Sequence, residues 1–121
     1  MISPLFQSKY IDRDPAFKMP KNACDAHVHV FGPSERFPYV ADRRYSPEDV
    51  PKEDLAALHQ ALGIDRSVLV QPTCHGTDNR AMLDALEWGK GRYRGVALLT
   101  GDESDAELAA MADTGAKPEC G

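Results

Sequence analysis

The chain has 121 residues, of which 42% are hydrophobic and 27% charged. This is the composition of an ordinary globular domain rather than of a disordered or fibrous chain. Its formal net charge of −5 argues against nucleic acid and against an anionic membrane surface as partners, because both attract basic proteins. No run of residues approaches the roughly 18 apolar residues of a membrane span, so we expect neither a membrane nor a nucleic-acid partner.

Residues 1–22 are rich in proline and charge, and we expect them to form an extended N-terminal arm. They lack the apolar core and the small-residue cleavage site of a signal peptide. The three cysteines, Cys24, Cys74 and Cys120, are widely spaced and form neither a disulfide framework nor a CxxC zinc motif. Together these features predict a cytoplasmic protein.

The first strand–helix unit follows this arm. Residues 23–30, ACDAHVHV, alternate in polarity and end in a Phe-Gly-Pro sequence, which predicts a strand and then a turn. Residues 31–51 are too rich in proline, charge and aromatic side chains for regular structure, and a loop of this length is usually functional or disordered. Leucines at helical spacing predict a helix that begins after Pro51 and ends at Gly63.

Two further units are predicted, with strands over 66–71 and 94–100 and helices over 78–89 and 104–115. Both strands are continuous apolar runs, as expected of strands that are buried on both faces. Asp78 is the expected N-cap of the first of these helices, and Ser104 and Glu107 have the spacing of a capping box in the second. Residues 117–121, KPECG, contain no apolar run, so no fourth strand is predicted there.

Alternation of strands and helices predicts an α/β fold with a parallel sheet, in which the three strands are adjacent in chain order. In such folds the functional groups gather at the carboxyl ends of the strands. His27 and His29 lie at one such end, and Thr73, Cys74 and His75 follow the next. The sequence therefore predicts that these two groups of residues share one side of the sheet.

His27 and His29 would point to the same face of a strand, about 7 Å apart. Two imidazoles in this arrangement suit ligation of one metal ion, donation of hydrogen bonds to a substrate carbonyl, or pairing with backbone groups at a strand end. His75 is either a third ligand or an ordinary loop residue, and the second interpretation is favoured. Cys74 is interpreted as a small buried hydrophobic residue.

Three other polar residues have simpler interpretations. His59 lies among leucines and alanines and is expected to be a packed or half-exposed helix residue. Arg43 and Arg44 could meet an anionic substrate, since guanidinium groups suit carboxylates, but a solvated pair on the loop is favoured.

Three segments, CDAHVHVFGPSERFPY, VLVQPTCHGTDNRAMLDAL and RGVALL, resemble the N-terminal part of the 2-pyrone-4,6-dicarboxylate lactonase family of the amidohydrolase superfamily. The resemblance runs from Cys24 to about Gly115. It implies the first three βα units of a truncated (β/α)8 TIM-type barrel. It also implies a hydrolase that opens a carboxylated cyclic ester in aromatic degradation, with a small anionic lactone as its partner.

The resemblance also implies roles for individual residues. His27 and His29 would be catalytic and polarise the reacting carbonyl, as donors to a developing oxyanion. Tyr45 would bind the substrate, and so would Thr73, which replaces a serine usual in the family. This branch of the superfamily works without a metal, so we expect no cofactor; the alternative is a divalent metal such as zinc at His27 and His29.

Other parts of the family pattern have no counterpart in the sequence. They are the arginines that clamp the carboxylates, a histidine on a later strand, and the aspartate that activates water. We therefore expect an arm over 1–22, a partial barrel domain over 23–116 and a divergent tail over 117–121, in a chain that is inactive by itself. The alternatives are a sugar-lactone or muconolactone hydrolase or isomerase, a metal-dependent amidohydrolase or decarboxylase of the same superfamily, and a non-catalytic truncated fragment. The sequence indicates no oligomeric state.

Overall fold

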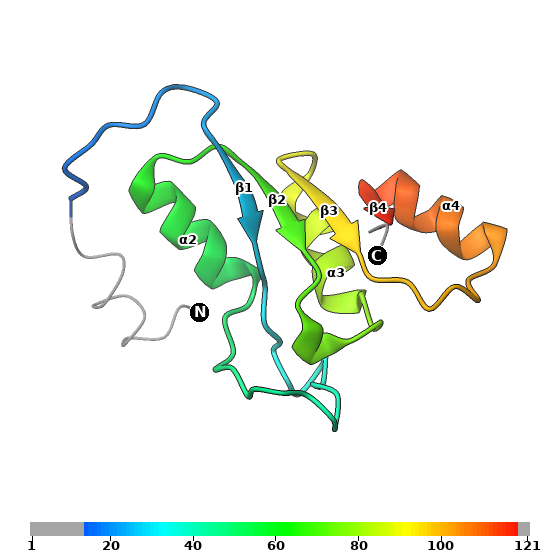
Figure 1. Ribbon diagram of the computed structural model, residues 1–121. Coiled ribbons are helices and arrows are strands. Elements are labelled where there is room, and N and C mark those ends of the chain that lie inside the picture. The colour runs from blue at the N-terminus through cyan, green and yellow to red at the C-terminus, as the bar shows by residue number, and fades with distance from the viewer. Residues whose placement is uncertain (1–13, 119–121) are drawn as a thin grey trace.

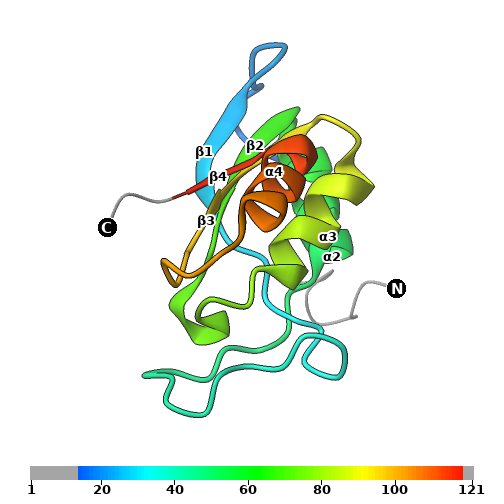
Figure 2. The ribbon, with the colours of Figure 1, turned by 90° about the vertical axis from the view of Figure 1, so that its right-hand side faces the viewer.

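The structure is a computed structural model that describes residues 14–118, so part of the predicted arm and part of the predicted tail lie outside the described residues. The described chain forms one parallel sheet with strand order β1-β2-β3-β4. Helices cover one face of this sheet and leave the other face open (Figures 1 and 2). The elements are β1 (Cys24–Val28), α2 (Lys52–Leu62), β2 (Arg66–Val70), the 3₁₀ turn η2 (Thr73–His75), α3 (Arg80–Gly89), β3 (Tyr93–Ala97), α4 (Asp105–Thr114) and β4 (Ala116–Pro118).

The prediction of a parallel α/β sheet with neighbouring strands in chain order is confirmed. β1 pairs with β2 and β2 with β3, both parallel, and a helix lies between each pair of strands along the chain. The strands are shorter than predicted: β2 ends at Val70, and β3 ends at Ala97, where the Leu98 backbone N–H and carbonyl bond to the Asn79 side chain instead of to a strand. No helix among the described residues is long and apolar enough to cross a membrane.

A fourth strand corrects the sequence analysis, which predicted no strand beyond Ala116. β4 pairs parallel with β3, with Ala116 beside Gly95 and Lys117 beside Val96. β4 forms without an apolar run because backbone hydrogen bonds pair it with β3. The first of them runs from the Gly95 N–H to the Gly115 carbonyl, at 3.0 Å. Ala116 is buried and packs this short edge strand against the hydrophobic core.

The helix ends follow local chemistry. The capping box of α4 is present, with the Ser104 side chain accepting from the Glu107 N–H and the Glu107 carboxylate accepting in return. α2 ends at Gly63 in the left-handed conformation, with φ 79°. The predicted N-cap of α3 is wrong by one residue: Asn79 holds that position, while the Asp78 carboxylate accepts from the Arg80 N–H and pairs with the Arg80 guanidinium.

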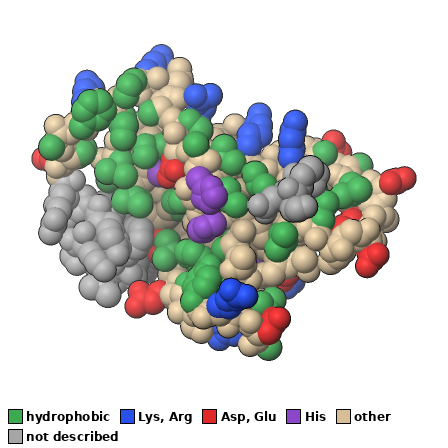
Figure 3. Space-filling model, in the orientation of Figure 1, with side chains coloured by type: hydrophobic (Ala, Val, Ile, Leu, Met, Phe, Trp, Pro, Cys, Tyr) green, Lys and Arg blue, Asp and Glu red, His purple; other side chains and the backbone are tan. Residues whose placement is uncertain are grey.

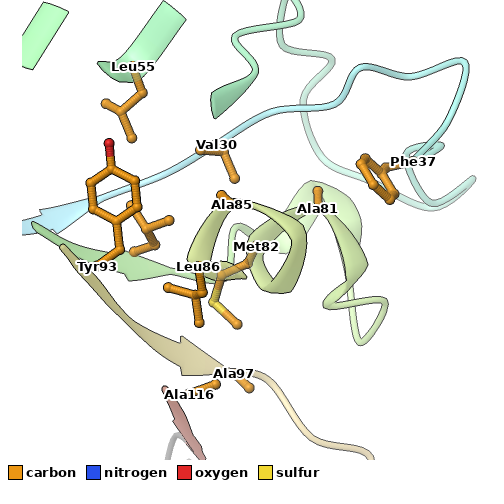
Figure 4. Close-up of a cluster of buried hydrophobic side chains, with 11 residues drawn as sticks. Val30, Phe37, Leu55, Ala81, Met82, Ala85, Leu86, Tyr93, Ala97 and Ala116 are labelled. Carbon is orange, nitrogen blue, oxygen red and sulfur yellow. The ribbon is translucent and has the colours of Figure 1, made fainter. Parts of the chain in front are cut away.

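The hydrophobic core lies between the sheet and its helices (Figure 4). Its members are the buried residues Val30, Phe37, Leu55, Leu69, Ala81, Met82, Ala85, Leu86, Tyr93, Ala97 and Ala116. Leu69 in β2 has no exposed surface, and Met82 and Leu86 of α3 lie over β3. This packing holds the carboxyl ends of β1 and β2 at fixed positions.

Gly95 is the point of closest approach between β3 and α3. A Cβ added there would lie 2.8 Å from Leu86 Cδ1 and 2.9 Å from Met82 Sδ. We expect Gly95→Ala to lower the free energy of unfolding by about 1–3 kcal/mol, because the helix must move outward. Urea denaturation measures this. Arg94→Ala, at the exposed neighbouring position, should change stability by no more than about 0.5 kcal/mol, and equal losses in the two variants would contradict the tight packing.

Candidate active site

The histidine pair lies on the open face of the sheet. Between Asp25 and Val28 the pairing of β1 with β2 is irregular, so that two residues of β1 stand opposite one of β2, as in a β-bulge. Val28 and Val30 pack toward the core, and His29 between them therefore points to the other face. Figure 3 shows histidine side chains in the middle of this face.

The rings of His27 and His29 are in contact, with centroids 5.4 Å apart and planes nearly perpendicular. The prediction that they point to the same side is confirmed. His27 is exposed and His29 half-buried. The ring of Phe31 lies 5.7 Å beyond that of His29, so the aromatic contacts continue from β1 into the loop that follows it.

A backbone hydrogen bond partner fixes the orientation of His29. Its Nδ1 donates to the carbonyl oxygen of Val70, at 2.8 Å, at the end of β2. A carbonyl oxygen only accepts, so Nδ1 carries a proton and Nε2 is free to face the open side of the sheet. In the neutral ring Nε2 is an acceptor, and it donates a hydrogen bond only when the ring is positively charged.

The loop 31–50 is ordered by hydrogen bonds within itself. Phe31 and Val50 exchange two backbone hydrogen bonds, 2.9 and 2.8 Å long, which close its base. Inside the loop the Asp49 carboxylate accepts from the Ser34 N–H and hydroxyl and from the Tyr39 hydroxyl. Burial opposes ionisation of Asp49, but these hydrogen bonds outweigh it and lower its pKa. The irregular loop that the composition predicted is thus a closed, internally bonded one.

The loop lies beyond the carboxyl ends of the strands (Figure 1) and brings Tyr45 beside the turn after β2. Its ring lies 6.5 Å from that of Phe31, edge to face, and 44% of the residue's surface is exposed. Burial raises the pKa of the Tyr45 hydroxyl, and the neighbouring Cys74 raises it further, while the neighbouring Thr73 hydroxyl acts in the opposite direction. Tyr45 therefore stays a neutral donor at ordinary pH. The two residues predicted to bind substrate, Tyr45 and Thr73, lie together, and the aromatic contacts connect them to the histidines.

The other polar residues of the sequence analysis lie outside this cluster. Arg43 is half-buried and donates to Ser46 and to the Val40 carbonyl, so its guanidinium stabilises the loop. His75 is buried in the turn η2. His59 is also buried, and its Nε2 donates to Asp25 at 3.0 Å, at the end of β1 opposite the site. The sequence left open whether His59 was packed or half-exposed, and it is packed.

Sequence reasoning missed several groups that shape the site. The Val70 carbonyl has no sequence signature, since any residue would present it. Asp49 could have been noticed as an acidic residue at the end of a loop with several hydroxyl groups, but nothing in the sequence pairs it with Tyr39. Among the described residues no three His, Cys, Asp or Glu side chains are grouped so that they could hold a metal ion. The residues described here therefore offer a metal at most two imidazoles.

The chain has a parallel α/β sheet, with paired histidines and a hydroxyl-bearing loop at the carboxyl ends of two neighbouring strands. This is the arrangement of α/β proteins that build their functional sites from the loops after the strands. Comparison with known proteins identifies the family within this class. The chain belongs to the amidohydrolase family, whose model matches residues 24–117.

Two hydrolases are similar to most of this chain. A 2-pyrone-4,6-dicarboxylate hydrolase from Comamonas testosteroni is 50% identical over 103 residues, which are 85% of this chain and 34% of the relative. A 4-sulfomuconolactone hydrolase from Hydrogenophaga intermedia is 42% identical over 100 residues, which are 83% of this chain and 33% of the relative. The chain thus spans about one third of the length of these relatives.

Solved structures agree with the fold. The crystal structure of a probable 2-pyrone-4,6-dicarboxylic acid hydrolase from Acinetobacter baumannii, with citric acid bound, matches with a TM-score of 0.71 and 29% identity. The match covers 78% of this chain and 35% of that one. An apo structure from Agrobacterium tumefaciens, 23% identical, matches with a TM-score of 0.72 over 86% of this chain and supports the fold alone.

Proposed function

We propose that this chain forms the first part of a (β/α)8 lactone hydrolase that opens a cyclic ester bearing acidic groups. The observation that carries the proposal is the contact between the histidine pair and the loop with Tyr45, at the carboxyl ends of β1 and β2. It occurs in a chain 50% identical to a 2-pyrone-4,6-dicarboxylate hydrolase over most of its length. The two similar hydrolases both take their names from lactones with acidic substituents.

In the proposed site His27 and His29 bind the ester carbonyl, and Tyr45 and Thr73 bind the acidic part of the lactone. Because His29 uses Nδ1 on the Val70 carbonyl, it donates to a carbonyl oxygen only as an imidazolium. This refines the expectation that both histidines are simple donors. As an imidazolium, His29 would be a charged donor to the oxyanion that forms when water attacks the ester.

No step of this proposal runs through a metal, because the described residues bring only two imidazoles together. The Asp25 carboxylate, which accepts from the His27 backbone N–H, also accepts from His59. Asp49 is bonded to Ser34 and Tyr39, and Asp78 to Arg80. We therefore propose that these residues bind and polarise the lactone, and that activation of water needs a group beyond them.

Titration of the chain with 2-pyrone-4,6-dicarboxylate, followed by NMR, tests the proposal. We expect shifts of the His27, His29 and Tyr45 resonances that saturate with a dissociation constant on the order of 1 mM or lower. Ring opening, followed by loss of the pyrone absorbance, is expected to remain at the buffer rate. Shifts confined to other surfaces would refute the proposed site. Turnover by the chain alone would refute the proposal that activation of water needs a group beyond these residues.

The sulfonated lactone is a second candidate ligand, since a 4-sulfomuconolactone hydrolase is 42% identical over 83% of the chain. The same titration with 4-sulfomuconolactone compares the two acidic groups directly. A planar pyrone with two carboxylates and a non-planar lactone with a sulfonate should differ most at Tyr45, which lies on the loop. The tighter ligand identifies the substrate class.

A further inference from the structure

His75 is buried to 1% exposure, although it lies in the turn η2 that also carries Thr73. Its Nε2 accepts a hydrogen bond of 3.0 Å from the Gly32 backbone N–H, so the proton of the neutral ring is on Nδ1. That nitrogen lies 3.4 Å from the Pro38 carbonyl oxygen. One imidazole thus holds two points of the loop 31–50 against the turn after β2.

The immediate neighbours of His75 strengthen this attachment. The rings of His75 and Tyr39 are in contact, with centroids 4.8 Å apart, and the Tyr39 hydroxyl donates to Asp49 near the end of the loop. The Val40 N–H donates to the Cys74 carbonyl at 2.8 Å. The loop therefore follows the position of η2 through contacts centred on His75.

The attachment requires a neutral ring, because a proton on Nε2 would remove the acceptor. The titratable groups around His75 are Tyr39, Asp49, Cys74 and Asp78. Burial lowers the pKa of His75 below its ordinary value of 6.5, and it outweighs the hydrogen bond to Pro38 and the charges of Asp78 and Asp49, which act in the opposite direction. The stability that depends on this ring is fully present above about pH 6.5 and is lost as the pH falls through the lower folded-state value.

We propose that His75 is a positioning residue of the lactone site: by accepting from Gly32 it fixes the loop that carries Tyr45 relative to His27 and His29. His75 is too buried to touch a ligand on the open face, so it acts through the loop. The inference rests on the proposed function for the ligand, but the position of Tyr45 is measurable without one.

Three variants separate positioning from general stability. His75→Gln offers a side-chain oxygen as acceptor and does not titrate, whereas His75→Leu removes the acceptor at similar volume. His59→Gln is the matched control, because His59 is a second buried histidine, bonded to Asp25 at the opposite end of β1. A purely structural effect would be common to all three.

NMR of the free chain gives the readout that does not depend on a ligand. At about pH 7.5 the wild type, His75→Gln and His59→Gln should show nuclear Overhauser contacts between the Tyr45 ring and the Thr73 methyl group, and His75→Leu should lose them. On acidification until the His75 ring itself protonates, which its own ring proton resonances report, the wild type should lose these contacts and shift its Gly32 amide resonance, while His75→Gln keeps both. If His75→Leu does not fold, the pH comparison of the wild type with His75→Gln still tests whether His75 positions the loop.

Lactone affinity provides the second readout. We expect His75→Leu to bind 2-pyrone-4,6-dicarboxylate about tenfold more weakly and His75→Gln to stay within about threefold of the wild type. A folded His75→Leu that keeps the Tyr45 contacts, or a His75→Gln that loses them with acid as the wild type does, would overturn the proposal. If the wild type binds no lactone, the proposed function fails, and the Overhauser contacts alone decide the role of His75.

Discussion

Replacing His29 by Asn should weaken binding of 2-pyrone-4,6-dicarboxylate by about 10- to 100-fold while leaving the fold intact. An asparagine amide can donate to the Val70 carbonyl in place of Nδ1, so the backbone contact survives. The ring nitrogen Nε2 that would meet the ester carbonyl is lost, and a charged hydrogen bond contributes about 1.5–3 kcal/mol. Calorimetric titration measures the affinity, and urea denaturation measures the stability.

Two comparisons make this result specific. His29→Ala should lose affinity to the same extent and also lose stability, by about 1–2 kcal/mol, because the Val70 carbonyl then loses its partner. Lys90→Ala, at an exposed position after α3, should change neither quantity. Unchanged affinity in a folded His29→Asn would show that Nε2 does not contact the lactone. It would refute the proposal that the histidine pair binds the ester carbonyl.

Truncation of Leu69 is expected to have the largest effect on stability. Its side chain has no exposed surface and lies in β2, in the centre of the sheet. Leu69→Ala should lower the free energy of unfolding by about 2–5 kcal/mol through lost burial and a residual cavity. Because small domains have only about 5–15 kcal/mol of stability in total, this loss removes a large share of it. Urea denaturation followed by circular dichroism measures the change.

Leu108→Ala is the control for this truncation. Leu108 lies in α4 and is 37% exposed, so the same chemical change should cost no more than about 0.5 kcal/mol. Similar losses at the two positions would mean that the sheet core is not packed as described. A wild type without any cooperative transition would mean that this core does not form in the isolated chain.

The sequence by itself determined the elements of this protein. Apolar runs and turn residues predicted β1, β2, β3 and the three helices, because these patterns act over a few neighbouring residues. The spacing of His27 and His29 was enough to place both rings on one face, since side chains alternate along a strand. The motifs of the strands and turns also pointed to the amidohydrolase family, which the comparisons confirm.

Only the tertiary structure decided how these elements are connected into a site. β4 depends on backbone pairing with β3, and backbone hydrogen bonds carry no mark in the sequence. The tautomer of His29 depends on the Val70 carbonyl, and the closure of the loop depends on the contact between His75 and Gly32. These partners are 41 and 43 residues apart along the chain, so no local pattern can pair them; folding brings them together because the parallel sheet aligns the carboxyl ends of its strands.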